Sequence, residues 1–170
     1  MKTLHLIRHA KSSWDFPELA DIDRPLNKRG KKACVKMAEP IVAAGCDLKT
    51  IFCSPALRAQ QTISRISKAL DDSLLWHIEQ HLYTFSFDEL LKFCLELGDE
   101  LDEVVLVGHN PGFTDLCNFL IEDYIENLPT CGYGQFACDI DSWAQLTENC
   151  AQLVEFITPK DLEPYEGQSS

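Results

Sequence analysis

The chain of 170 residues lacks any long hydrophobic run. A membrane-spanning helix needs roughly 18 consecutive apolar residues, and charged residues interrupt every run here within about eight residues. At the N-terminus, Arg8 and His9 end the apolar stretch before it reaches the length of a signal-peptide core. These absences exclude a membrane-spanning segment and lead us to expect a cytoplasmic protein.

Positive charge is scarce. The chain has 15 Lys and Arg against 27 Asp and Glu, which gives a formal net charge of −12. A broad surface for nucleic acid or for anionic membranes would need an excess of cations, so we expect neither partner. A small basic pocket within an acidic protein is still allowed.

Paired cysteine motifs are also absent. None of the eight cysteines forms a Cys-x-x-Cys pair, which argues against a zinc ribbon and against a redox motif. Most of the cysteines lie inside apolar patterns. We therefore predict that they are reduced core residues.

What the chain does contain is the composition of a folded domain, with 45% hydrophobic and 25% charged residues. Domains typically have about 100–200 residues, so we assign a single domain to residues 1–158. The segment 159–170 is acidic, contains two prolines and has no periodicity. We predict that it is a flexible tail.

Apolar periodicity alternates between strands and helices along this domain. The segment 104–107 is continuously apolar and β-branched, as is typical of a central strand in a parallel sheet. Alternation of this kind predicts a three-layer α/β/α sandwich with a mainly parallel central sheet and helices on both faces. The predicted strands are 4–7, 50–53, 74–78 and 104–107, with late edge strands at 135–140 and 152–157; the predicted helices are 28–44, one opened by Ser54-Pro55, one from 86 to about 97, and one after Pro111.

Local signals mark the ends of these helices. Asn27 is a predicted N-cap and Gly45 a predicted C-cap, while Pro40 should kink or end that helix near Glu39. Ser54-Pro55 predicts a cap followed by the first helical residue. The segment 86–89 has the pattern of a capping box.

Basic and imidazole side chains follow three of the predicted strands. Arg8 and His9 end the first strand, Arg58 comes one turn into the helix after the second, and His109 ends the fourth. The carboxyl ends of parallel strands share one edge of a sheet, and ligands of open α/β sheets bind there. Two guanidiniums together with helix N-termini form a natural site for a dianionic phosphate.

Four motifs of the sequence contain these residues or lie between them. They are LIRHAKS (6–12), DRPLNKRG (23–30), CSPALRAQQT (53–62) and VGHNP (107–111). Together they resemble the motifs of the histidine phosphatase superfamily, which includes phosphoglycerate mutases. Within that superfamily the chain is similar to the short SixA-type branch of phosphohistidine phosphatases, and the resemblance spans about residues 3–158.

The resemblance implies a role for each residue of the site. His9 would be the nucleophile that accepts the phosphoryl group, and Arg8, Arg58 and His109 would hold its oxygens. Arg24 matches the Arg-Pro-Leu motif of the branch and would approach the phosphate, or would instead pair with Asp21 or Asp23 to fix its loop. Phosphoryl transfer mainly requires positioning and charge stabilisation, so these groups predict an enzyme without metal or other cofactor.

The general acid is not evident from the sequence. Glu79 is the position that we nominate, whereas Asp15 and Asp115 have no distinctive context. Asn110 stands where acid phosphatases of the superfamily have an acidic residue, which favours phosphohistidine over ordinary phosphate esters as the substrate. The alternatives are a small-molecule phosphomonoesterase and a phosphate-binding module of low turnover. The expected partner is accordingly a phosphorylated protein or a small phosphorylated metabolite.

Overall fold

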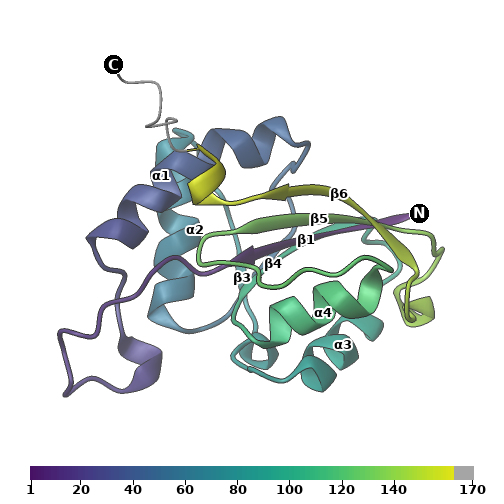
Figure 1. Ribbon diagram of the computed structural model, residues 1–170, viewed down its shortest axis with the longest axis horizontal. Coiled ribbons are helices and arrows are strands. Elements are labelled where there is room, and N and C mark those ends of the chain that lie inside the picture. The colour runs from purple at the N-terminus through teal and green to yellow at the C-terminus, as the bar shows by residue number, and fades with distance from the viewer. Residues whose placement is uncertain (163–170) are drawn as a thin grey trace.

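A six-stranded sheet with the strand order β3-β2-β4-β1-β5-β6 forms the centre of the computed structural model, which describes residues 1–162. Four α-helices cover its two faces (Figure 1). The strands are β1 (Lys2–Arg8), β2 (Ile51–Cys53), β3 (His77–Ile78), β4 (Glu103–Gly108), β5 (Tyr133–Cys138) and β6 (Ala151–Ile157), and the helices are α1 (Lys28–Ala43), α2 (Leu57–Ala69), α3 (Phe87–Leu95) and α4 (Gly112–Leu120).

The sheet is mainly parallel, as predicted. β1 pairs in parallel with β4, β4 with β2, and β2 with β3. β5 runs antiparallel to both of its neighbours, β1 and β6. The two late strands were expected at an edge, and this is correct only for β6, because β5 lies between β1 and β6 and is therefore internal.

Alternate residues of the central strands supply two separate cores. Leu4 and Leu6 of β1 pack with α3 and α4 on one face, while Ile7 packs with α1 and α2 on the other. The period of two follows from the pleat of a strand. Seven of the eight cysteines are buried and the eighth is partly buried, and all are free thiols, which confirms their predicted role in the core.

The N-cap of α1 agrees with the sequence, whereas its C-cap and its proline differ from the prediction. The Asn27 side chain accepts a hydrogen bond from Gly30 N. The C-cap is Ala44 rather than Gly45, which is the next residue and has a positive φ of 99°. However, α1 continues past Pro40 to Ala43. Proline costs the helix one bond to the carbonyl of Lys36, and Lys36 lies on the exposed side, where water can satisfy that group.

Other boundaries also differ from the sequence prediction, and β5 begins and ends two residues earlier than expected. α2 begins at Leu57 rather than Pro55, with Ala56 as an N-cap that makes no side-chain bond. The third strand has only two residues, because β3 pairs solely with the short edge of β2. Ser86 is the N-cap of α3 without the predicted capping bond, and the helix ends at Leu95.

The predicted tail begins with a short 3-10 helix, η4 (Pro159–Leu162), which packs against α1. The remainder of the tail lies outside the described residues. Within residues 1–162, no helix combines the length and the apolar character needed to cross a membrane.

Candidate active site

Three neighbouring strands end at the same edge and bring the predicted residues together. β1 ends beside β4, where Arg8 is in register with Gly108, and β4 ends beside β2. The backbone amide of His9 donates to the Gly108 carbonyl, and that of Ser54 donates to the Val107 carbonyl. The parallel sheet thus places residues that are about 100 positions apart in the sequence on one rim.

The loop after β1 closes one side of this rim. Its residues Ser12 and Leu26 form an isolated antiparallel bridge, and the Leu26 amide donates to the Gln61 side chain on α2. Gly30 packs directly against the Lys11 backbone, and a Cβ there would lie well inside contact distance of the Lys11 carbonyl oxygen. Glycine is therefore required at position 30 for α1 to dock on the loop.

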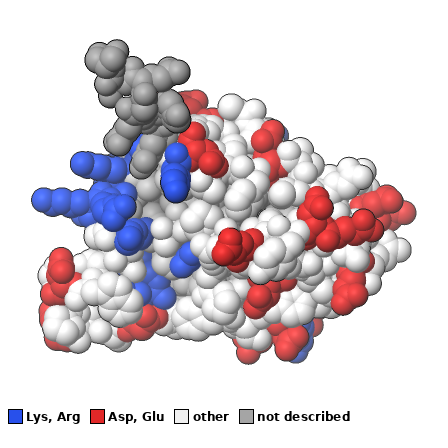
Figure 2. Space-filling model, viewed as in Figure 1, with Lys and Arg blue, Asp and Glu red and all other residues white. Residues whose placement is uncertain are grey.

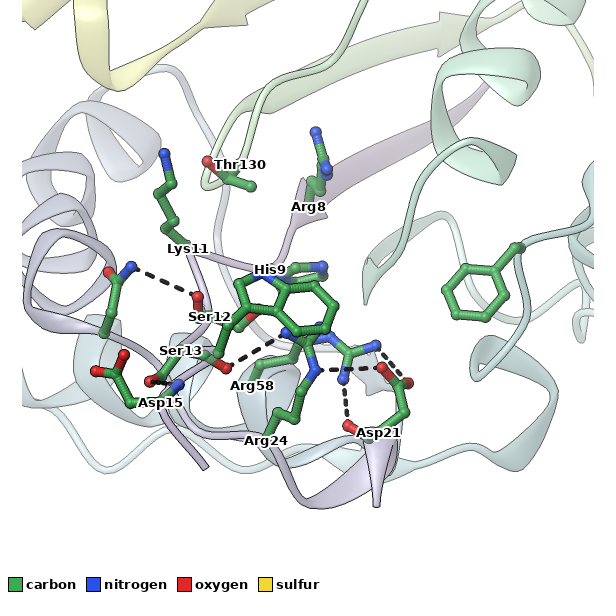
Figure 3. A pocket seen from close by; sticks show the side chains of 13 residues that line it. Arg8, His9, Lys11, Ser12, Ser13, Asp15, Asp21, Arg24, Arg58 and Thr130 are labelled. Carbon is green, nitrogen blue, oxygen red and sulfur yellow. Dashed lines mark hydrogen bonds and ion pairs between the residues drawn. The ribbon is translucent and has the colours of Figure 1, made fainter. Parts of the chain in front are cut away.

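A cavity of about 490 Å³ opens at this rim (Figure 3). We call it the catalytic cavity. It collects residues of β1 and its loop, a 3-10 helix η1 (Asp21–Asp23), α2 and two further loops. Its lining residues are Arg8, His9, Lys11, Ser12, Ser13, Trp14, Asp15, Asp21, Arg24, Asn27, Arg58, Phe85 and Thr130.

The hydrogen bond of His9 defines which of its two ring nitrogens is unprotonated. Its Nδ1 lies 2.7 Å from the Ala10 carbonyl oxygen, and since a carbonyl only accepts, Nδ1 carries the proton. Nε2 is then the unprotonated nitrogen. Burial, together with the charges of Arg58 and Arg8, lowers the pKa of His9 to about 4, so the ring is neutral at pH 7.

His109 lies beside His9, with ring centroids 5.1 Å apart. Its Nε2 is 2.8 Å from Ser54 Oγ, and that hydroxyl also accepts from the Ala56 amide. The single hydroxyl proton has no other acceptor among the described residues, so Oγ donates to Nε2 and the imidazole proton is on Nδ1. Burial, with the nearby His9 and Arg58, lowers the pKa of His109 to about 3.

The two arginines from outside the sheet meet at Asp21. The Arg58 side chain, only 2% exposed, donates from Nη1 to the Asp21 carbonyl and from Nη2 to its carboxylate, at 2.7 and 3.0 Å. Arg24 Nε donates to the other carboxylate oxygen, and its guanidinium stacks on the Trp14 ring (Figure 3). Partial burial alone would raise the pKa of Asp21, but hydrogen bonds from Tyr83 and Arg58 lower it to about 2.

Three buried nitrogens have no hydrogen-bond partner among the described residues, and all belong to this site. They are Nε of Arg8, Nε of Arg58 and Nδ1 of His109. Buried polar groups are normally hydrogen-bonded, and a buried donor without an acceptor costs roughly 1–3 kcal/mol of free energy. An anion with several acceptor oxygens would satisfy such donors.

The structure confirms that the sheet brings Arg8, His9, Arg58 and His109 together, although His109 contacts His9 without being among the cavity-lining residues. Arg24, for which the sequence left two alternatives, lines the cavity and pairs with Asp21. Glu79 is not among the cavity-lining residues; it caps the 3-10 helix η2 (Gln80–Leu82) and hydrogen-bonds the exposed His81. The other acid candidates divide: Asp15 lines the cavity, while Asp115 lies exposed on α4.

Asn110 has a structural role in the site. Its side-chain oxygen accepts from the Thr114 amide at the start of α4, and its amide group donates to the Leu128 carbonyl. The same carbonyl accepts from Arg8 Nη1 at 3.0 Å. Asn110 therefore fixes the loop that also orients Arg8.

Sequence reasoning missed several members of the site. Asp21 entered only as one of two partners for Arg24, while Trp14, Phe85 and Thr130 were not considered at all. The rings of Tyr83 and Phe85 pack edge-on against His109, at 5.5 and 5.6 Å between centroids. Only the aspartates of segment 21–24 carried a sequence signal, through their charge beside a basic motif.

The fold and the site define an α/β domain with arginines and histidines gathered at the carboxyl ends of its strands. The family model of the histidine phosphatase superfamily (branch 1) matches residues 4–91, just over half of the chain. The chain belongs to this superfamily.

Known proteins of similar sequence and fold agree with that assignment. An uncharacterised protein of Mycobacterium tuberculosis is 28% identical over 165 residues, covering 91% of this chain and 100% of its own. The structure of the protein histidine phosphatase SixA complexed with tungstate superposes with a TM-score of 0.78 at 18% identity, covering 95% and 99% of the two chains. A phosphoserine phosphatase of Entamoeba histolytica in complex with 3-phosphoglyceric acid gives a TM-score of 0.66 at 18% identity, covering 96% and 100%.

Proposed function

We propose that this chain is a phosphohistidine phosphatase that works through a phosphorylated His9. In the first step a bond forms between phosphorus and His9 Nε2 while the P–N bond of the substrate breaks, and the substrate imidazole leaves as a neutral group because its other ring nitrogen carries a proton. In the second step water attacks that phosphorus and the P–Nε2 bond breaks. Inorganic phosphate leaves with the protons of the water, and His9 is regenerated as a neutral imidazole with its proton on Nδ1. Membership of the superfamily supports phosphatase chemistry; the substrate and the residue roles are our proposal.

The state of His9 supports its role as the nucleophile. Its Nδ1–H is engaged with the Ala10 carbonyl, which directs the lone pair to Nε2. With a pKa of about 4, the ring needs no deprotonation before it attacks at neutral pH. A buried, neutral and oriented imidazole is what such an attack requires.

The single observation that carries the proposal is the set of unpartnered donors around this nucleophile. Arg8 Nε, Arg58 Nε and His109 Nδ1 are buried and unbonded in the described structure. A transferring phosphoryl group spreads charge over three equatorial oxygens, which such donors stabilise. We infer that these donors, with Arg24 beside them, balance that charge without a metal ion.

The carboxylates of the site favour a substrate whose leaving group needs no proton. Asp21, with a pKa of about 2, is ionised at neutral pH and is held by Arg58 and Tyr83. Glu79 lies outside the cavity lining, and Asp15, the candidate acid that does line the cavity, is an exposed side chain. The protonated form of imidazole has a pKa near 6.5, so a phosphohistidine ring can carry the required proton on its other nitrogen and leave as a neutral group. An alkoxide must instead take a proton from an acid of the enzyme, so phosphohistidine is preferred over phosphate esters of serine or sugars.

Trapping of the intermediate tests the proposal. Rapid quench with radiolabelled phosphohistidine should yield an acid-labile, alkali-stable phosphoenzyme in the wild type and none in His9→Ala. His77→Ala is the matched control, since His77 is exposed and lies outside the cavity. It should be labelled like the wild type. An acid-stable adduct, or equal labelling of His9→Ala, would exclude the mechanism.

A substrate panel separates phosphohistidine phosphatase from the two alternatives. Higher kcat/KM on phosphoserine or sugar phosphates would make the protein a phosphomonoesterase. Stoichiometric binding of phosphohistidine without repeated turnover would make it a binding module. We expect many turnovers, with kcat/KM highest on phosphohistidine.

A further inference from the structure

A second hollow, of about 590 Å³, lies next to the catalytic cavity. We call it the basic groove and define it by its five cationic residues, which are Lys11, Arg29, Lys32, Lys36 and Lys160. No Asp or Glu of residues 1–162 lines it. In a chain with a net charge of −12, this concentration of positive charge is unexpected. Figure 2 shows Lys and Arg gathered on the left, at the α1 side of the molecule, and Asp and Glu dominating the right.

Three of the five cations form a row on one face of α1. Arg29, Lys32 and Lys36 are related by spacings of three and four residues, which places them on the same side of a helix. At 1.5 Å per residue the row is about 10 Å long. Lys160 comes from η4, which packs against α1. The positive charges are therefore spread along the groove and do not converge on one point.

The cations of the groove have no ionic partner in the described part of the chain. All five are exposed, and none forms an ion pair with a carboxylate of residues 1–162. Like charges four residues apart on a helix, such as Lys32 and Lys36, repel each other and destabilise it. Stabilisation of α1 therefore does not explain the presence of this row of cations.

The groove and the catalytic cavity share two wall residues, Lys11 and Thr130 (Figure 3). The two hollows therefore adjoin at Lys11, on the wall of the cavity that contains His9. From Lys11 the next cations along the wall are those of α1. The positive surface is continuous with the site of the proposed reaction.

We propose that the basic groove binds an acidic segment of the protein that carries the phosphohistidine. The proposal rests on the function proposed above. A single phosphate is a poor match, because it needs convergent, buried donors such as those of the catalytic cavity. Separate, exposed cations along about 10 Å instead match an extended chain, which advances about 3.3 Å per residue and can place successive carboxylates along the row.

Kinetics with paired peptides test the groove. One peptide carries phosphohistidine flanked by Glu and the other carries it flanked by Gln, and phosphoimidazole serves as the small substrate. Lys32→Glu/Lys36→Glu should raise KM for the Glu peptide roughly tenfold, since each lost exposed ion pair contributes modestly. The kcat for the Glu peptide should be unchanged, and so should the kcat and KM for the Gln peptide and for phosphoimidazole. Lys32→Gln/Lys36→Gln should give a smaller increase in the same direction.

Lys68→Glu/Lys92→Glu is the matched control. Both lysines are exposed on other helices, outside both hollows, and the change in net charge is identical. Its KM for the Glu peptide should stay within twofold of the wild type. An equal increase in the control, or an equal increase for the Glu and Gln peptides, would overturn the proposal.

Direct binding separates failure of the groove from failure of the proposed function. Anisotropy of a fluorescent, unphosphorylated Glu-rich peptide should rise on binding to the wild type and to the control but not to Lys32→Glu/Lys36→Glu. The signal should fall in high salt. If the wild type hydrolyses no phosphohistidine, this measurement still decides for or against the groove. Equal binding by all three proteins, or binding to phosphatidylserine vesicles in place of the peptide, would refute it.

Discussion

Ser54 offers a sharp test of how His109 is prepared for its proposed role. Its hydroxyl is fully buried and lies 2.8 Å from His109 Nε2. By donating to Nε2 it holds the proton of the imidazole on Nδ1, the atom that has no partner in the described structure. Ser54→Ala removes this restraint without removing the imidazole. It should therefore weaken catalysis mainly through His109, with a smaller effect from the bond that the hydroxyl accepts from the Ala56 amide.

The expected magnitudes follow from the two bonds at stake. Loss of one preorganised donor to a reacting oxyanion costs about 3 kcal/mol, so His109→Ala should lower kcat/KM by more than 100-fold. A neutral hydrogen bond contributes about 1 kcal/mol, so Ser54→Ala should lower kcat/KM about fivefold. The unpartnered Nε2 should also reduce the free energy of unfolding by roughly 1–3 kcal/mol.

The assay is a double-mutant cycle on kcat/KM with phosphohistidine. Adding Ser54→Ala to His109→Ala should cost almost nothing further, because the serine acts through the imidazole that is already absent. Ser67→Ala is the control: Ser67 is also buried with two hydrogen bonds, but it lies outside the cavity and should affect only stability. Additive effects of Ser54→Ala and His109→Ala on kcat/KM would refute the reasoning.

Four further predictions concern ionisation, charge, the nominated acid Glu79 and metal. His9 and His109 have pKa values of about 4 and about 3 in the folded protein, against 6.5 in the unfolded chain. The unfolded chain therefore takes up protons first as the pH falls, and the free energy of unfolding should decrease below pH 6.5 by about 1.4 kcal/mol per pH unit for each ring. Urea titrations should show a shallower decrease in His9→Ala, and an unchanged slope would contradict the lowered pKa of His9. Asp21→Asn removes the anion that Arg58 contacts. Since that carboxylate is 46% exposed, kcat/KM should decrease roughly tenfold or less. A decrease as large as that of Arg58→Ala would mean that Asp21 contacts the substrate. Glu79→Gln and thorough chelation should each leave kcat/KM on phosphohistidine within twofold of the untreated wild type, and activity restored by one divalent ion would overturn the metal-free mechanism.

The sequence was sufficient to predict the layered α/β architecture and the grouping of Arg8, His9, Arg58 and His109. Both follow from local patterns: periodicity identifies the strands, and in a parallel sheet the residues that follow neighbouring strands must share one rim. Boundaries were less predictable, because they depend on tertiary contacts. The start of α2 moved past Pro55 since the preceding Ser54 side chain bonds His109 and the Ala56 amide.

Only the tertiary structure decided the partners of these residues. Asp21 reaches Arg58 across 37 positions, and Tyr83 joins it from 62 positions away, with no periodicity linking the three. The tautomers of His9 and His109 likewise depend on single acceptor and donor atoms that folding places within 3 Å. The sequence determined which groups were available and at which edge of the sheet they lie, because strand and helix periods are local properties. Their hydrogen bonds, ionisation and shared cavity required the fold, because burial and side-chain contact are properties of segments that meet only in three dimensions.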